Sequence, residues 1–272
     1  MSLETLTGSP YLSFSSLESW LTCGERYRLE KVIGVASTKA WYLLGGSAVH
    51  EATEIIDKAY LAGEEQPTAD EAWNTAWAKQ IATLEANEEV RAGGRVSKEW
   101  PEKENAAWWS HHGPTFTQSW VDWRDKQIAD GWQLLEVEHA FQIELGTVPV
   151  RGFIDRILAD ANGQVHVVDL KTGSHTPAGA LQLGVYSLGY EANTGVKATI
   201  GEYFMNRKGQ PSPSESLLKY TPEVVGKWFD MARRAIEAEV FVPHVTAMCG
   251  SCSVQKFCVA RGGTPPISNP GK

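Results

Sequence analysis

Apolar residues near the N-terminus recur at helical spacing. Over residues 12–32, a run of serines suited to capping a helix is followed by Leu17 and Trp20, and Gly24 interrupts the pattern. A second helix is predicted over residues 44–63, where four apolar residues share one face. We expect both segments to pack on a core by their apolar sides.

The middle of the chain is rich in tryptophan. Residues 68–130 hold seven of the eleven tryptophans, and two pairs of them lie three or four residues apart. This spacing places both rings of a pair on one helix face, which is typical of buried packing and much less often of a platform for stacking nucleic-acid bases. The pattern predicts a Trp-rich helical insert over residues 61–131.

After Gly131 the hydrophobic period changes from that of helices to that of strands. Three β-rich runs, separated by short turn sequences, are typical of an antiparallel meander: 133–145, 148–160 and 164–173. Three further elements are then expected: a helix over 176–195, a strand over 198–209 and a helix over 221–240. Strands interspersed with helices predict an α/β fold.

Composition and charge restrict the protein class. The 272 residues are 42% hydrophobic, and the formal net charge of −8 argues against a protein that coats duplex DNA by bulk electrostatics. The acid surplus lies in residues 51–104, with 13 acids and 6 bases. Without a leader pattern or a long apolar stretch, we expect a soluble cytoplasmic protein that does not bind a membrane. Its four cysteines are then free, catalytic or metal-bound rather than disulfide-linked.

Two aspartates are predicted to face each other across a hairpin. If the turn of "ADANGQ" is centred on Asn162, position i faces position 324 − i, and Asp155 lies opposite Asp169. Opposed side chains are about 5 Å apart, so the carboxylates repel unless a cation or a shared proton lies between them. Lys171 points the same way as Asp169, because strand side chains alternate. A routine surface Asp–Lys pair is the weaker interpretation, since both strands are almost continuously apolar.

Two other helices carry polar residues suited to this place. Gln182 and Tyr186 are four residues apart and share a helix face. His50 and Glu51 follow "LGGSAV", whose small residues permit close backbone approach. Taken alone, His50 would more often be a capped or core histidine than a ligand. With two aspartates it becomes a candidate ligand, and Glu51 a candidate for supporting it.

Four motifs in order resemble a known family. "GSAVHE", "GFIDRI", "VVDLKTG" and "QLGVY" resemble the motifs of RecB-type nucleases of the PD-(D/E)XK superfamily, although Ile154 replaces the proline of its name. The resemblance implies a restriction-endonuclease-like core, with a mixed central β-sheet flanked by helices. It implies one nuclease domain over 1–272: N-terminal helices over 12–60, the insert, a core over 132–240, a cysteine segment over 241–260 and a flexible tail over 261–272.

The same resemblance implies roles for the candidate residues. His50, Asp155, Asp169 and the main-chain carbonyl of Leu170 would bind a catalytic Mg²⁺ or Mn²⁺. Lys171 would orient or deprotonate the attacking water and offset charge on the phosphate. Two residues of the following helix would position the substrate backbone or the active site: Gln182 and Tyr186.

Three cysteines are spaced C-x2-C-x5-C near the C-terminus, and a fourth lies far upstream: Cys249, Cys252, Cys258 and Cys23. A redox pair is a weaker interpretation of this C-x-x-C, because redox motifs open a helix after a strand. A four-cysteine zinc site and an iron–sulfur site both fit the spacing. The order resembles AddB-type subunits and the CRISPR-associated iron–sulfur exonucleases, which implies a structural 4Fe-4S cluster clasping both chain ends. Relatives often have proline where Gly24 stands.

The expected function is a metal-dependent exonuclease acting on single-stranded DNA or DNA ends. One alternative is a nuclease subunit of CRISPR adaptation or recombination that trims DNA for a partner. Another is a non-catalytic DNA-binding adaptor with a zinc site. No G-x-x-x-x-G-K-[ST] motif is present, so any unwinding would come from a separate helicase.

Overall fold

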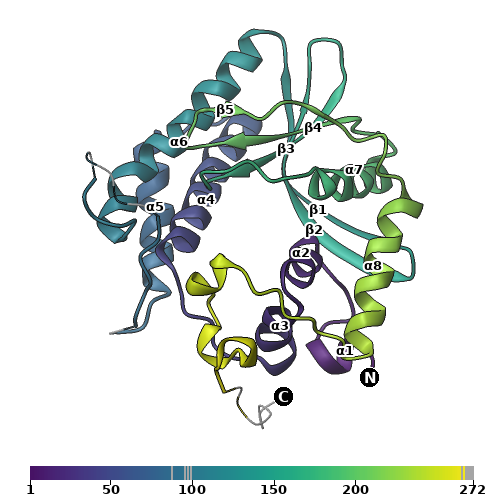
Figure 1. Ribbon diagram of the computed structural model, residues 1–272. Coiled ribbons are helices and arrows are strands. Elements are labelled where there is room, and N and C mark those ends of the chain that lie inside the picture. The colour runs from purple at the N-terminus through teal and green to yellow at the C-terminus, as the bar shows by residue number, and fades with distance from the viewer. Residues whose placement is uncertain (87, 95, 97, 99, 265, 267–272) are drawn as a thin grey trace. The chain divides into compact units, whose positions relative to one another are not determined.

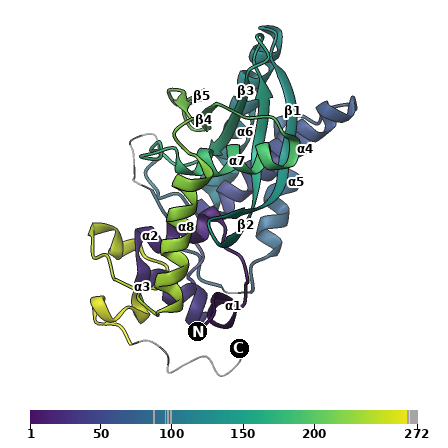
Figure 2. The same cartoon turned by 90° about the vertical axis from the view of Figure 1, so that its right-hand side faces the viewer.

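The computed structural model describes residues 1–86, 88–94, 96, 98, 100–264 and 266. The chain divides into two compact units. Figure 1 labels their main helices and strands, and Figure 2 shows them from a second side. The first unit comprises residues 1–38, 142–152 and 220–272, and the second comprises residues 39–141 and 153–219.

The first unit is built from short helices at both ends of the chain. Its N-terminal elements are α1 (Leu3–Thr7), α2 (Phe14–Thr22), α3 (Gly24–Tyr27) and a π-helical turn, η1 (Arg28–Ile33). Its C-terminal elements are α8 (Pro222–Glu237) and three 3-10 turns, η2 (Ala247–Ser251), η3 (Gln255–Phe257) and η4 (Val259–Arg261).

The helix predicted over residues 12–32 is broken at Cys23, which has extended backbone between α2 and α3. The C-terminal segment passes very close to this break, where the Gly24 nitrogen donates to the Val242 carbonyl at 3.0 Å. A β-carbon on residue 24 would lie 2.8 Å from the Val242 nitrogen, so a side chain does not fit there. The interruption predicted at Gly24 lies one residue earlier, at Cys23, and Gly24 begins α3, where it permits this close backbone approach.

The second unit holds a mixed sheet. Its strands are β1 (Gln133–Leu145), β2 (Val148–Ala159), β3 (Val165–Lys171), β4 (Ile200–Met205), β5 (Gln210–Pro211) and β6 (Glu215–Ser216). They lie in the order β1-β2-β3-β4-β5, and β6 also pairs with β4. β2 and β3 are antiparallel, whereas β3 and β4 are parallel and joined through α7 (Leu181–Thr194). The tip of the β1–β2 hairpin, residues 142–152, counts with the first unit.

The register predicted for the β2–β3 hairpin is confirmed. Arg156 pairs with Val168 and Ala159 pairs with Val165, so partner numbers add up to 324 as a turn centred on residue 162 requires. The next position in this register sets Asp155 opposite Asp169. Both strands are buried on both faces here, from Ile154 in β2 and throughout β3 as far as Leu170.

Three helices of the second unit use their tryptophans for packing: α4 (Trp41–Ala62), α5 (Ala69–Ala82) and α6 (Ala106–Ala129). Trp73 and Trp109 are buried in a cluster with the apolar face of α4. A β-carbon on Gly45 of α4 would lie 2.0 Å from the Trp109 ring, so the small residue lets that ring sit against the helix. Trp120 packs on the sheet residues Val168 and Phe204. The predicted α/β fold, a mixed sheet flanked by helices with tryptophan clusters, is confirmed.

Two remaining expectations concern the surface and the tail. Within the part of the chain that the structure describes, no helix is both long enough and apolar enough to cross a bilayer. Residues 265 and 267–272 of the tail predicted over 261–272 lie outside the described residues.

Candidate active site

The sheet brings the two aspartates together on neighbouring strands. Asp155 of β2 and Asp169 of β3 are both buried. The Leu170 main-chain nitrogen donates to Asp155 Oδ2 at 2.8 Å, which fixes one carboxylate against the next strand. A carboxylate buried in this way requires such partners, because an unpaired charge in an apolar setting is costly.

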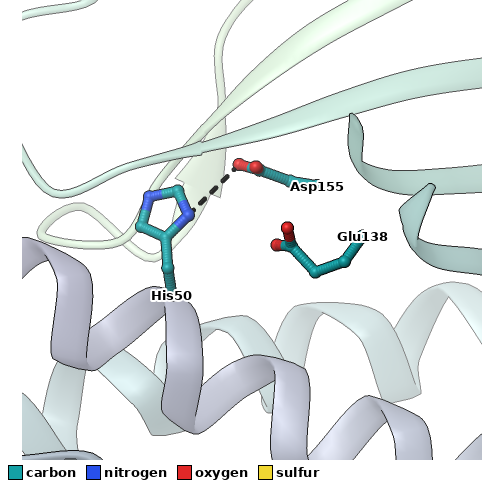
Figure 3. A group of neighbouring side chains, drawn as sticks. All are labelled: His50, Glu138 and Asp155. Carbon is teal, nitrogen blue, oxygen red and sulfur yellow. Dashed lines mark ion pairs between the residues drawn. The ribbon is translucent and has the colours of Figure 1, made fainter. Parts of the chain in front are cut away.

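His50 projects from α4 toward Asp155, as Figure 3 shows. Its Nδ1 atom lies 3.3 Å from Asp155 Oδ2. The imidazole ring also forms a hydrogen bond with the main chain of Leu170. Burial lowers the pKa of His50, and Asp155 opposes that shift. The imidazole is therefore held neutral near pH 7, which is the form that binds a metal ion.

Glu138 of β1 completes a group that sequence reasoning missed. One ligand atom from each of His50, Glu138 and Asp155 lies within 4.8 Å of the others (Figure 3). The backbone of Glu138 has a φ of 52°, a left-handed conformation that costs about 1–2 kcal/mol in a non-glycine residue. Strain of this kind at a strand residue marks a place where the surroundings hold a side chain in a set direction.

The Glu138 carboxyl is also strongly perturbed. Burial, with a smaller contribution from the charge of Asp155, raises the pKa of Glu138 to about 7, against a partial offset from Arg156. A carboxyl in this environment is poised to lose its proton when a cation arrives.

Lys171 belongs to a connected row of polar groups at the end of β3. Its Nζ lies 2.6 Å from Asp169 Oδ2 and donates to Gln182 Oε1 at 2.9 Å. Gln182 Nε2 in turn donates to the Tyr186 hydroxyl at 2.9 Å. Burial, followed by the charges of Asp169 and Asp155, raises the pKa of Tyr186, so its phenol stays protonated.

The structure thus places the predicted residues in two adjoining groups. The first group consists of His50, Asp155 and Glu138. The main chain of Leu170 forms hydrogen bonds with His50 and with Asp155. Within the described residues, Asp169 is not part of this compact group and instead pairs with Lys171.

A cavity of about 770 Å³ opens over the first group. His50, Glu138 and Asp155 line it. Two lysines at its wall are paired with acids of α4, Lys79 with Glu51 and Lys58 with Glu54, each at 2.6 Å. Glu51 therefore orders the cavity wall by holding Lys79, which is a supporting role away from the ligand group.

The four cysteines line a second, small cavity within the first unit. None of the four forms a disulfide bond. Main-chain nitrogens donate to two of the sulfurs at 3.4 Å: His244 to Cys23 and Thr246 to Cys249. The hydrogen bond from Arg28 to Glu25 raises the pKa of Arg28, and the charge of Cys258 adds a smaller contribution in the same direction. Arg26 lines the cavity. N–H donors and nearby guanidinium groups suit sulfurs that carry negative charge, as metal-ligating thiolates do.

Comparisons with known proteins found a matching family profile, phage relatives and a similar fold. A sequence profile of the PD-(D/E)XK nuclease superfamily matches residues 11–259. The chain is 29% identical to the Gene 69 proteins of Mycobacterium phage L5 and Mycobacterium phage D29, covering 94% and 92% of this chain and 98% and 96% of theirs. A crystal structure from Eubacterium rectale, provisionally named an exonuclease, is similar in fold with a TM-score of 0.50 at 13% identity, over 99% of this chain and 94% of that one.

Proposed function

Because the chain belongs to the PD-(D/E)XK nuclease superfamily, we propose that it is a metal-dependent deoxyribonuclease acting as an exonuclease on single-stranded DNA or DNA ends. The observation that carries the proposal is the group of His50, Glu138 and Asp155, with ligand atoms within 4.8 Å of one another. This group adjoins the Asp169–Lys171 pair. Together they supply carboxylate and imidazole groups that can hold a divalent metal ion and an ammonium group beside it, a combination suited to phosphodiester hydrolysis.

The first group fits a hard divalent cation. One neutral imidazole and two carboxylates offer the nitrogen and oxygen ligands that Mg²⁺ or Mn²⁺ accepts. We propose His50 and Asp155 as ligands together with Asp169 and the Leu170 carbonyl, and we add Glu138 to this set. A divalent ion bound there would supply Lewis-acid stabilisation of the charge that develops on the phosphate oxygens.

Lys171 is proposed to act on the attacking water. The pairing with Asp169 and the hydrogen bond to Gln182 hold its ammonium at a set place beside the carboxylates. From there the ammonium orients the attacking water and offsets phosphate charge, whereas deprotonating the water would require the lysine in its neutral amine form. The water oxygen bonds to phosphorus while a phosphorus–oxygen ester bond breaks, releasing a hydroxyl end and a phosphate end. Gln182 and Tyr186 set the position of Lys171 and of the substrate backbone.

The cysteine site is proposed to hold a structural 4Fe-4S cluster. Four thiols around one cavity, with two main-chain N–H donors and nearby arginines, suit an anionic thiolate-ligated group. Cys23 comes from the α2–α3 break, and the other three come from the C-terminal turns of the same unit. The cluster would clasp these two chain ends together.

The phage relatives support a place for the protein in the cytoplasm of a phage-infected cell. A DNA-trimming subunit of a recombination or CRISPR-adaptation complex would use the same chemistry, with a helicase or recombination protein as its partner. The linked Lys171–Gln182–Tyr186 row speaks against a purely DNA-binding adaptor with a zinc site, because binding alone does not require it.

A time course on end-labelled DNA tests the proposed function. Single- and double-stranded DNA carrying a 5′ or a 3′ label is incubated with the protein and Mg²⁺, Mn²⁺ or EDTA. We expect mononucleotides or short products to leave one end of single-stranded DNA with either metal and none with EDTA. Cleavage that persists in EDTA would contradict a metal-dependent site, and internal cuts in a circular single strand would contradict exonuclease action.

A further inference from the structure

A cluster of buried charged side chains lies behind the ligand group, and nothing in the proposed chemistry uses it. We call it the Asp57 cluster: Asp57 and Thr53 of α4, Trp120 and Arg124 of α6, and Arg156 of β2. These residues are buried, and the two arginines and Asp57 have no exposed surface. Charges at this depth are retained only where their hydrogen bonds are satisfied.

The Asp57 carboxylate holds both arginines. It accepts from Arg124 Nη1 on one oxygen and from Arg156 Nε on the other, each at 2.5 Å, and from Trp120 Nε1 at 2.8 Å. Two guanidinium groups thereby share one anion, and each has further donors to place elsewhere.

The remaining donors of Arg156 reach the backbone and side chains of the ligand group. Nη1 donates to the Asp155 carbonyl at 2.7 Å and lies 3.7 Å from Glu138 Oε1. Nη2 donates to Thr53 Oγ1 at 3.0 Å, and that hydroxyl donates to the His50 carbonyl at 2.9 Å. One rigid guanidinium plane is therefore connected to each of the three residues that face one another across the site.

Arg124 holds the same carboxylate but turns its other donors elsewhere. They bind Gln66 Oε1 at 2.7 Å and the neighbouring, half-exposed Asp125 at 2.7 and 2.9 Å. The two arginines thus share a structural role, and Arg156 alone, among the contacts of the described residues, continues to the ligand group.

We propose that Arg156, anchored by Asp57, is a positioning residue that sets the spacing of His50, Glu138 and Asp155 for a divalent cation. This inference rests on the proposed function, because it needs the cation to bind at that group. Partners that orient metal ligands change metal affinity by about 10–100-fold when they are replaced. Lysine keeps the charge of arginine but lacks its planar fork, so it holds Asp57 and loses the other contacts.

The test compares two conservative variants, Arg156→Lys and Arg124→Lys, by the free Mn²⁺ that remains in solution, measured by electron paramagnetic resonance. We expect both variants to unfold a few degrees below the wild-type protein, because each loses hydrogen bonds in the Asp57 cluster. Only Arg156→Lys is expected to bind Mn²⁺ about tenfold more weakly. Thr53→Val, which removes a single hydroxyl from the relay, is a milder second variant with an expected smaller loss of Mn²⁺ affinity.

The inference would be overturned if folded Arg156→Lys bound Mn²⁺ with wild-type affinity. If Arg156→Lys fails to fold, wild-type Mn²⁺ affinity in Thr53→Val would overturn it. An equal loss of affinity in Arg124→Lys would also overturn it, since the effect would then follow from general destabilisation. Asp155→Asn separates this inference from the proposed function. If the wild type binds Mn²⁺ and Asp155→Asn does not, the site stands and only the role of Arg156 is at stake. If Asp155→Asn binds as the wild type does, both proposals fail.

Discussion

At the scale of single residues, the position of the Lys171 ammonium is set by its ion-pair and hydrogen-bond partners. An exposed lysine has about 2 kcal/mol of rotamer entropy, and its ammonium samples many positions. Here Asp169 and Gln182 restrict the ammonium to one place, and the Tyr186 hydroxyl fixes Gln182 in turn. The Q-x-x-x-Y pair therefore serves the lysine of the preceding strand directly.

Replacing Lys171 tests this arrangement. We expect Lys171→Ala to lower the rate of DNA cleavage by at least about 100-fold, because a positioned proton-transfer or charge-stabilising group is lost. Gln182→Ala should have a smaller effect, about tenfold on kcat, because the ammonium keeps Asp169 but loses its second acceptor. Single-turnover kinetics at saturating metal measure both. Cleavage by Lys171→Ala at the wild-type rate would remove the lysine from the mechanism.

The protonation of Glu138 links the candidate active site to the stability of the folded protein. Its carboxyl has a pKa of about 7 in the folded protein against a reference value of 4.5. A raised carboxyl pKa means that the unfolded chain loses the proton first, so stability is highest below about pH 4.5, falls as the pH rises toward 7, and then levels off. In metal-free protein, Glu138 therefore opposes folding at neutral and alkaline pH.

Glu138→Gln should remove this cost. We expect the metal-free variant to be more stable than the wild type by about 2 kcal/mol at about pH 8, and equally stable at about pH 4. Thermal unfolding in EDTA at both pH values measures the difference. A variant that is less stable at the higher pH would show that the carboxylate is well compensated in the folded protein.

At the scale of elements, the sequence predicts the parts whose physics is local. Alternation and a short turn fix the β2–β3 register. An apolar stripe and Gly195, which adopts the left-handed conformation, fix the end of α7. The start of α7 is predicted about five residues too early, because Pro177 resembles a helix start but the helix begins at Leu181.

Other parts depend on tertiary packing that no pattern encodes. β1 carries several acidic residues. The left-handed backbone of Glu138 directs the side chain of that residue toward His50 and Asp155. The pairing of Asp57 with Arg156 joins positions 99 residues apart, and the burial of such charges is the reverse of what their residue types predict.

Helix α4 offers a test of element packing. Alanine normally stabilises a helix interior over glycine by about 1 kcal/mol. At Gly45 we expect the opposite, a loss of about 1–3 kcal/mol in Gly45→Ala, because the added methyl would overlap the Trp109 ring. Gly179→Ala, with no atom within 4 Å of the added carbon, serves as the control with little change. Denaturant unfolding of both variants gives the comparison.

At the scale of the whole molecule, the cysteine site ties together distant parts of the sequence. Cys23 and Cys258 both line one cavity, so a metal group bound there would cross-link the two ends of the chain within the first unit. A long-range link of this kind restricts the unfolded chain and couples folding to metal binding.

Metal analysis of anaerobically purified protein tests the cluster. We expect about four irons per chain, brown colour and broad absorbance near ~400 nm. Cys252→Ser should lose iron and unfold at a lower temperature, whereas the surface variant Ser251→Ala should retain both iron and stability. Stoichiometric zinc without iron would replace the 4Fe-4S proposal by a four-cysteine zinc site.

We propose that Asp155 belongs to the group that makes this protein a metal-dependent nuclease. The most direct measurement is Mg²⁺-dependent cleavage of 5′-labelled single-stranded DNA by the wild type, by Asp155→Asn, and by Asp122→Asn, which changes an exposed aspartate of α6. We predict that the wild type and Asp122→Asn cleave at similar rates and that folded Asp155→Asn is inactive. Cleavage by Asp155→Asn at the wild-type rate would show that Asp155 does not hold a metal ion needed for cleavage.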